Sequence, residues 1–362
     1  MNRISSKSWC AIISIIVCAM LALGTTVTAG SLEEAAKKEG KLRIVAFPSF
    51  KGIAKAFQEK YGIQVEGIHF GAPSILRKVS QESDAGVFKI DAFSASPGPL
   101  AADLNKWMAK YDPKGSNNVA KIKALLPKHW KSIPAFVHVV GAVYHDELVK
   151  GKDIPKSIYD LHKSKFKGKI ISRTPWLGTN FFVHILAYYT WFNKDMAKWN
   201  NYWSKFNVNI GRKTPKFVGM HNAVGMKEYH MGVYTLPYSP STFGPAHGNH
   251  LQYTTFKEGG IWFPNFIAVH KKAPHPNAAK LFAQFVISDE GQKYFQSINL
   301  VPANEKLGPS DLLKEAFKGV DLFYKDVDGT PLVSTLVREM DKKSGRRKAW
   351  VNKIKKAYGH KG

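Results

Sequence analysis

Two hydrophobic periods alternate along the first third of the chain. Residues 41–47, which end in the apolar run 44–47, are typical of a buried strand, and residues 52–61 carry apolar side chains at helical spacing. Residues 63–70, which are rich in β-branched side chains, and residues 89–94 predict two further strands. Between them, Ser74 is positioned to cap a helix. Strands that alternate with helices predict a parallel sheet covered by helices on both faces.

The same alternation continues in the second half of the chain. Residues 137–144 form a long apolar segment, whose length suits a strand that crosses between two lobes. Further elements are predicted as strands at 169–172, 232–235 and 262–270 and as helices at 181–192 and 276–287. The lysine-rich stretch 342–361 is expected to form a solvated helix.

Length and charge limit the possible functions. A chain of 362 residues exceeds what one compact core usually holds, so two lobes are expected. The net charge of +26 attracts anions, which include small anionic solutes, anionic envelope polymers and nucleic acid. Adaptation of the whole surface to an external medium would also explain this charge. The sequence leaves these alternatives open.

The first residues predict export. Arg3 and Lys7 precede the apolar run 11–23, which has the length of the apolar region of a signal sequence and is shorter than a typical membrane span. Small residues at 27–29 then predict cleavage close to Gly30, although an uncleaved anchor is an alternative. The expected location is the periplasm.

Both cysteines of the chain, Cys10 and Cys18, lie within this predicted signal. Val17 precedes Cys18, which does not favour lipidation. The mature chain would therefore contain no disulfide, no thiolate metal site and no cysteine nucleophile.

Short segments in a fixed order carry a resemblance to a known family. They are residues 32–42, 54–65, 144–148, 154–157, 166–169, 209–212, 228–232, 275–282, 288–292 and 301–303. Their order and spacing, over roughly residues 31–310, resemble the type 2 periplasmic binding proteins of the ferric-iron and phosphonate transporter branch. The resemblance implies two doubly wound α/β lobes joined by hinge strands, with the ligand in the cleft between them.

The resemblance also implies a domain plan and partners. The expected units are a signal peptide (1–29), lobe 1 (30–137 and 260–302), lobe 2 (138–259), and C-terminal helices with a basic tail that pack on lobe 2 (303–362). The partners would be a small ligand and an inner-membrane permease of an ABC importer. ATP would be hydrolysed by a separate subunit, because the chain lacks a Gly-x-x-x-x-Gly-Lys-Ser/Thr loop. No cofactor and no nucleic acid are expected, and the protein would be a monomer.

Ligands of open parallel sheets bind beyond the carboxyl ends of the strands. The candidate ligand-binding residues in those loops are Ser49, Ser74, Ser94, Ser96, Arg173, Trp176, Thr179, Asn180, Tyr238 and Ser239. The loops are rich in hydroxyls and nearly free of carboxylates, which favours an anionic ligand such as a phosphonate or a carboxylate. Arg173 would give a bidentate contact, whereas Ser74 and Thr179 would act at helix starts or serve only as caps.

Ferric iron, bound together with a synergistic anion, is the alternative ligand within this branch. The family usually supplies two adjacent tyrosines, but here Pro237 precedes Tyr238. Tyr234 would share a face with Tyr238 if both lay on one strand, so these two residues are the metal candidates. The adjacent pair Tyr188 and Tyr189 is expected to pack in a core.

Catalysis is not expected. The chain has neither a Gly-x-Ser-x-Gly elbow nor a His-Glu-x-x-His pair. His247 and His250 show only a weak metal-like spacing. A non-catalytic protein that binds envelope polymers through its charge is the remaining alternative.

Overall fold

The computed structural model describes residues 31–96, 99–176, 179–258, 260–320, 322–323, 325–340 and 344–359. The predicted signal peptide, its cleavage site and both cysteines lie outside these ranges. Within them, no helix combines the length and the hydropathy that a membrane crossing requires.

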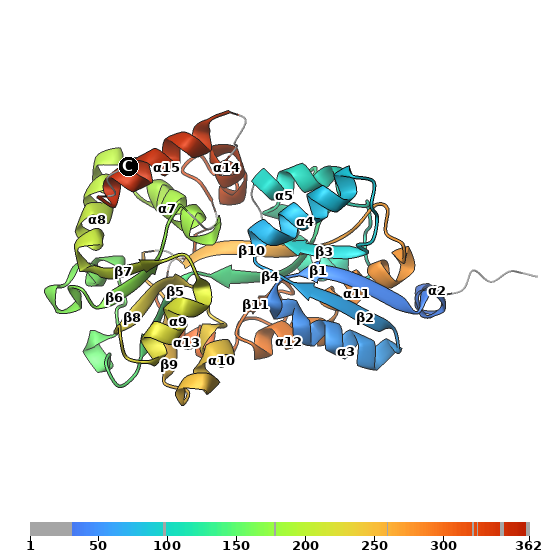
Figure 1. Ribbon diagram of the computed structural model, residues 1–362, viewed down its shortest axis with the longest axis horizontal. Coiled ribbons are helices and arrows are strands. Elements are labelled where there is room, and N and C mark those ends of the chain that lie inside the picture. Colours follow the sequence, from blue (N-terminus) through green and yellow to red (C-terminus); the bar gives the residue numbers. More distant parts are fainter. Residues whose placement is uncertain are drawn as a thin grey trace, which may run out of the picture.

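The chain forms two β-sheets, each flanked by helices (Figure 1). The first has the order β11-β4-β10-β3-β1-β2, with β12 paired to β10, and the second has the order β7-β6-β8-β5-β9. Strands of the first sheet are β1 (Lys41–Ala46), β2 (Gln64–His69), β3 (Ala92–Ala95), β4 (Ile133–Val139), β10 (Gly260–Val269), β11 (Val301–Pro302) and β12 (Leu322–Phe323). Strands of the second are β5 (Gly141–His145), β6 (Ile170–Arg173), β7 (Ile210–Thr214), β8 (Met231–Thr235) and β9 (Leu251–Thr254). We call the first sheet with its helices lobe 1 and the second lobe 2.

Lobe 1 is covered on both faces because successive residues of its strands are apolar. Leu42 and Ile44 of β1 belong to one buried cluster with α3 and α11, whereas Val45 belongs to another with α4 and α5. Its helices are α2 (Leu32–Glu39), α3 (Lys51–Tyr61), α4 (Ala72–Asp84), α5 (Pro99–Leu104), α6 (Ala120–Ala124), α11 (Pro276–Ile287), α12 (Asp289–Ser297) and α13 (Asp311–Ala316). Short 3₁₀ turns are η1 (Pro48–Phe50), η2 (Asn105–Trp107) and η3 (Ser116–Val119).

Lobe 2 has an aromatic core on one face of its sheet and a smaller cluster on the other. Trp199, Trp203 and Tyr188 are buried in the aromatic core, whereas Met220 and Val224 belong to the smaller cluster. Its helices are α7 (Thr179–Trp191), α8 (Met196–Asn209), α9 (Phe217–Gly225), α10 (Ser239–Phe243), α14 (Leu332–Glu339) and α15 (Arg346–Ala357). Short 3₁₀ turns are η4 (Gly151–Asp153), η5 (Ile158–His162), η6 (Ser164–Phe166) and η7 (Gly244–His247).

The predicted crossing segment 137–144 is divided into two strands, one in each sheet. β4 ends at Val139 in lobe 1 and β5 begins at Gly141 in lobe 2. The hydroxyl of Tyr253 donates to the carbonyl of Val139 at 2.7 Å, and that of Thr255 donates to the carbonyl of Val140 at 3.3 Å. The segment 253–255, at the end of β9, therefore satisfies the two carbonyl groups at the crossing between the lobes.

Strand directions at this crossing decide which ends of the two sheets face each other. β10 is antiparallel to both β3 and β4, so β4 runs in the same direction as β1, β2 and β3. β5 is antiparallel to β8, which is parallel to β6, as β6 is to β7. The carboxyl ends of the parallel strands in both lobes therefore point toward the crossing from opposite sides.

Two predictions about helices need correction. Ser74 does not cap α4, because the helix begins at Ala72 after Gly71 and has no side-chain cap. The stretch 342–361 is not simply a solvated helix, because α15 buries Trp350 and Ile354 in the core of lobe 2.

Candidate ligand-binding site

Six loops follow the carboxyl ends of the parallel strands, and we call them the interlobe loops. In lobe 1 they begin after β1, β2 and β3, and in lobe 2 after β6, β7 and β8. Ligands of such sheets bind beyond these strand ends. All candidate residues except Ser94, within β3, and Tyr234, within β8, lie in these loops, at their edges, or in the first turn of the helices that follow them.

Two serines of lobe 1 hold the interlobe loops in place. Ser94 is fully buried and its Oγ accepts the backbone N–H of Phe47 at 2.9 Å. Ser96 is also buried and its Oγ donates to Oδ1 of Asn265 at 2.5 Å. Ser49 is half-buried in η1. Of these three hydroxyls, that of Ser49 has the most exposed setting.

Ser74 lies apart from the buried serines. It is half-buried and lines a depression of about 300 Å³ beside α4, together with Phe70 and Arg77. The other lining residues are Lys78, Gln81 and Glu82.

Arg173, at the end of β6, is a half-buried cation without a counterion among the described residues. Its Nη2 donates to the carbonyl of Pro215 at 3.3 Å, and its guanidinium carbon lies 5.6 Å from the centre of the Phe217 ring. Its Nε is buried and has no hydrogen-bond partner among the described residues. Burial lowers the pKa of Arg173, with a smaller opposing effect of Tyr238. A desolvated guanidinium with free donors is suited to an anionic acceptor.

A chain of buried hydroxyls lies next to Phe217. His221 Nδ1 contacts the carbonyl of Phe217 at 2.8 Å and Nε2 contacts Oγ1 of Thr235 at 2.9 Å. Because a carbonyl can only accept, Nδ1 carries the proton and Nε2 accepts from Thr235. Thr235 Oγ1, 2.8 Å from Ser239 Oγ, then accepts the proton of Ser239. Ser239 is fully buried, and its hydroxyl proton is directed inward.

The two candidate tyrosines lie in different surroundings. Tyr238 is half-buried beside Phe217, with ring centres 6.2 Å apart, and burial raises its pKa to about 12. Tyr234 lies in the aromatic core, where its hydroxyl is 3.1 Å from that of Tyr202. The two do not share a strand, because β8 ends at Thr235 and Tyr238 precedes α10. The expectation that both face one side of a strand is therefore wrong.

The loop after β6 contains the remaining candidates. Trp176 packs against the core of lobe 2, and its ring centre lies 5.9 Å from Nζ of Lys355 in α15. Thr179 and Asn180 form the first turn of α7, which confirms that a helix begins at Thr179. Their side chains lie outside the described part of the structure. No sequence signal pointed to Lys355, because it is distant from this loop along the chain.

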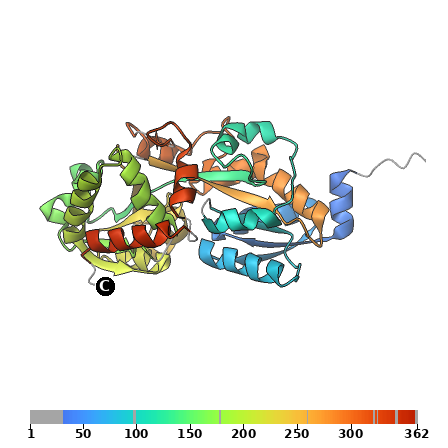
Figure 2. The ribbon, with the colours of Figure 1, turned by 90° about the horizontal axis from the view of Figure 1, so that it is seen from above.

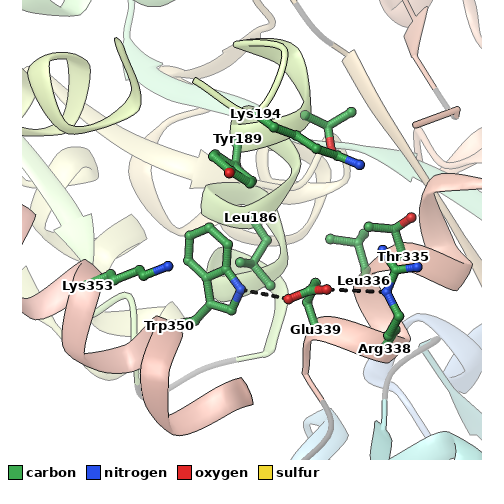
Figure 3. A pocket seen from close by; sticks show the side chains of 10 residues that line it. Leu186, Tyr189, Lys194, Thr335, Leu336, Arg338, Glu339, Trp350 and Lys353 are labelled. Carbon is green, nitrogen blue, oxygen red and sulfur yellow. Dashed lines mark hydrogen bonds and ion pairs between the residues drawn. The ribbon is translucent and has the colours of Figure 1, made fainter. Parts of the chain in front are cut away.

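A cavity of about 330 Å³ lies between α7, α14 and α15 (Figure 3). Its walls include Leu186, Trp350 and Lys353, but none of the candidate ligand-binding residues. Glu339 in this cavity accepts from Nε1 of Trp350 at 3.1 Å and from Nε of Arg338 at 3.3 Å. Its charge is thus already compensated.

The described residues contain no cluster of three or more His, Cys, Asp or Glu side chains that could hold a metal ion. His247 Nε2 lies 3.3 Å from Oδ1 of Asn222, and His250 Nδ1 lies 2.9 Å from Oδ1 of Asp146. The spacing of the two histidines therefore reflects separate contacts.

Comparison with known proteins identifies the family. The family model of bacterial extracellular solute-binding proteins matches residues 99–327, which is more than half of the chain. The chain belongs to this family. Its members bind solutes and are not enzymes, so the prediction of a non-catalytic protein is confirmed. No curated protein matches the chain in sequence.

Solved structures of solute-binding proteins share the fold. Iron-bound HitA from Pseudomonas aeruginosa is 21% identical over 83% of this chain and 99% of its own, with a TM-score of 0.65. AfuA from Actinobacillus pleuropneumoniae, with fructose-6-phosphate bound, is 20% identical over 87% and 98%, with a TM-score of 0.64. An ABC-transporter binding protein from Agrobacterium tumefaciens is 15% identical over 87% and 95%, with a TM-score of 0.69. The prediction of a type 2 periplasmic binding protein fold is confirmed.

Proposed function

We propose that this solute-binding protein captures a small anionic solute, of phosphonate, phosphate-ester or carboxylate type, between its lobes. The closed form would deliver the solute to a membrane permease of an ABC importer. We further propose that the protein acts as a periplasmic monomer. The units that close would be lobe 1, which includes α13 and β12, and lobe 2, which includes α14 and α15.

Arg173 carries this proposal. It is a desolvated guanidinium at the end of a parallel strand, and the described part of the chain offers neither an acceptor to its Nε nor a carboxylate that pairs with it. Leaving such a cation unpaired costs stability, which is consistent with a group kept for binding. An organic phosphate is the ligand named for the similar AfuA structure, so the fold accommodates an anion of this class.

Ferric iron is less well supported than a plain anion. A ferric ion requires several hard anionic oxygen ligands. Of the two candidate tyrosines, Tyr234 lies in the core, and Tyr238 has its phenol near the interlobe loops. Iron-bound HitA shares the fold, but at 21% identity this similarity extends to the fold alone.

Titration calorimetry on Arg173→Gln tests the proposal. With methylphosphonate, inorganic phosphate and acetate as probes, we expect the substitution to weaken binding of the preferred anion by roughly tenfold or more. The matched control is Arg212→Gln, whose guanidinium is exposed and pairs with Glu228 at 3.3 Å. If both variants bind like the wild type, Arg173 is not the anchor. If ferric citrate binds and Tyr238→Phe abolishes that binding, the iron alternative replaces the proposal.

A further inference from the structure

The C-terminal helix α15 has one of the most uneven charge distributions in the described part of the chain. Its twelve residues include six cations and no carboxylate: Arg346, Arg347, Lys348, Lys353, Lys355 and Lys356. Within the described ranges, none of the six forms an ion pair with a carboxylate. A helix that only needs a soluble face usually mixes both signs. This charge therefore calls for a more specific explanation.

The position of α15 brings one of these cations to the loop after β6 and another to the first turn of α7. The guanidinium carbon of Arg347 lies 5.7 Å from the centre of the Phe182 ring, in the first turn of α7. Nζ of Lys355, two turns further along α15, lies 5.9 Å from the centre of the Trp176 ring. Trp176 lies within the connection between β6 and α7, and Phe182 follows that connection in the chain. Figure 1 shows α15 lying against α7 and α8 in lobe 2.

The neighbouring face of α15 fixes this arrangement. Trp350 packs on Tyr189 and Trp199, with ring centres 5.1 and 5.7 Å away, and Ile354 is fully buried. Because these residues anchor the helix, Arg347 and Lys355 are held beside the connection.

Arg347 shares the unusual feature of Arg173. Its Nε is buried and finds no hydrogen-bond partner within the described ranges, although the side chain is only half-buried as a whole. A buried donor without an acceptor is unfavourable, and an anion would supply the missing acceptor. Two guanidinium groups with this feature therefore flank the same connection, one from β6 and one from α15.

We propose that Arg347 and Lys355 form a second anion subsite beside the β6–α7 connection, which selects solutes with two anionic groups over monoanions. The proposal rests on the proposed function, because Arg173 binds the first anionic group. A solute such as a phosphorylated carboxylic acid or a dicarboxylate would engage both subsites. The basic C-terminal helix would then be a specificity element of the binding site.

Nuclear magnetic resonance of the arginine Nε–H groups tests the subsite without knowledge of the natural solute. The mature protein, labelled with ¹⁵N-arginine, is titrated with inorganic phosphate at constant ionic strength. We expect saturable shifts of both the Arg173 and the Arg347 signals. Arg347→Gln and Lys355→Gln should each raise the phosphate dissociation constant of the second subsite by about fivefold or more. Arg347 reports that subsite in Lys355→Gln, and the Trp176 indole N–H reports it in Arg347→Gln.

The matched control is Lys348→Gln, which removes the same charge from an exposed position of α15. It should change the dissociation constant by less than twofold. If Lys348→Gln and Arg347→Gln weaken phosphate binding equally, the effect comes from overall charge alone, and the subsite is overturned. A shift of Arg173 without one of Arg347 overturns the subsite but leaves the proposed function. A shift of Arg347 without one of Arg173 overturns Arg173 as the anchor in the proposed function but leaves an anion site at Arg347. If neither signal shifts, the subsite and the proposed function are both overturned.

Discussion

At the residue scale, two histidines are held in the neutral form by their surroundings. Burial lowers the pKa of His221 to about 4, and burial likewise lowers that of His270 to about 4. His270 Nδ1 accepts the backbone N–H of Lys272 at 3.1 Å, so its proton is on Nε2, facing Ser83 at 2.9 Å. Protonating either ring places a second N–H against a group that already donates. Both histidines therefore oppose protonation in the folded state.

The first prediction concerns pH. In the unfolded chain His221 takes up a proton near pH 6.5, whereas in the folded protein it does so only near pH 4. Its neutral form therefore costs no stability above pH 6.5, and the loss of stability grows as the pH falls from 6.5 to about 4. Between pH 6.5 and about 4, this group should lower the free energy of unfolding by about 1.4 kcal/mol for each unit by which the pH falls. Urea unfolding of His221→Gln should lack this contribution. The exposed control His129→Gln should keep the wild-type slope, and an unchanged slope in His221→Gln would contradict the account.

The same scale shows what residue types can and cannot predict. The sequence located Arg173 at a strand end, because an apolar run followed by Arg-Thr-Pro marks the end of a strand. It did not show that the hydroxyls of Ser94 and Ser239 are fully buried. A serine after a strand has the same sequence signal whether its side chain faces the ligand or the protein interior. Orientation depends on tertiary partners such as Thr235, which lie outside the local pattern.

At the element scale, the two lobes are joined where β4 passes into β5. A Cβ atom on Gly141 would overlap the carbonyl oxygen of Thr254 and the phenol of Tyr253. Since the backbone of β9 cannot move away without breaking its pairing with β5, only glycine fits at position 141. Segment 137–144 was predicted as one strand because both halves are apolar, and periodicity alone does not reveal a change of sheet.

Gly141→Ala should therefore destabilise the protein by about 3 kcal/mol, as overpacking does in a closely packed region. Gly219→Ala in α9 is the control, because a Cβ there meets only ordinary contacts, at 3.6 Å or more. That substitution should be neutral or raise stability by up to about 1 kcal/mol through helix propensity. Chemical denaturation measures both variants, and equal stabilities would show that the crossing tolerates a side chain.

Helix α15 gives the second prediction at this scale. Trp350 is 5% exposed and packs on two aromatic rings, so Trp350→Ala should cost about 3–5 kcal/mol. Lys348→Ala, on the exposed side, should change stability by less than about 0.5 kcal/mol. Equal and small effects in guanidinium unfolding would mean that α15 is not docked. The sequence suggested a solvated helix because its buried residues form a narrow stripe among lysines.

At the scale of the whole molecule, charge and lobe contacts act together. The lobes meet where Nδ2 of Asn299 donates to Oγ of Ser241 at 2.7 Å. They also meet at α14, whose Leu336 packs in the core of lobe 2 and whose Val337 packs against lobe 1 (Figure 2). The net charge of +26 raises the local concentration of anions around the two lobes.

This charge predicts which rate constant responds to salt. Long-range attraction is screened within about 10 Å at 0.1 M and about 3 Å at 1 M salt. The rate constant for association of an anionic ligand should therefore fall by roughly tenfold or more between 20 mM and 500 mM NaCl, whereas the rate constant for its dissociation should change little. Stopped-flow tryptophan fluorescence measures both. A salt effect confined to dissociation would contradict steering by the overall charge.

The central claim is that the protein binds a small anion, and a thermal-shift panel on the mature wild-type chain tests it most directly. The panel contains phosphonates, phosphate esters, sulfate, carboxylates, ferric citrate and spermidine at low ionic strength. A ligand at one hundred times its dissociation constant stabilises the folded protein by about 2.7 kcal/mol, which is a shift of a few degrees. The account predicts such a shift with at least one organic anion and none with spermidine. A shift with spermidine, or with ferric citrate but not with citrate, would contradict it.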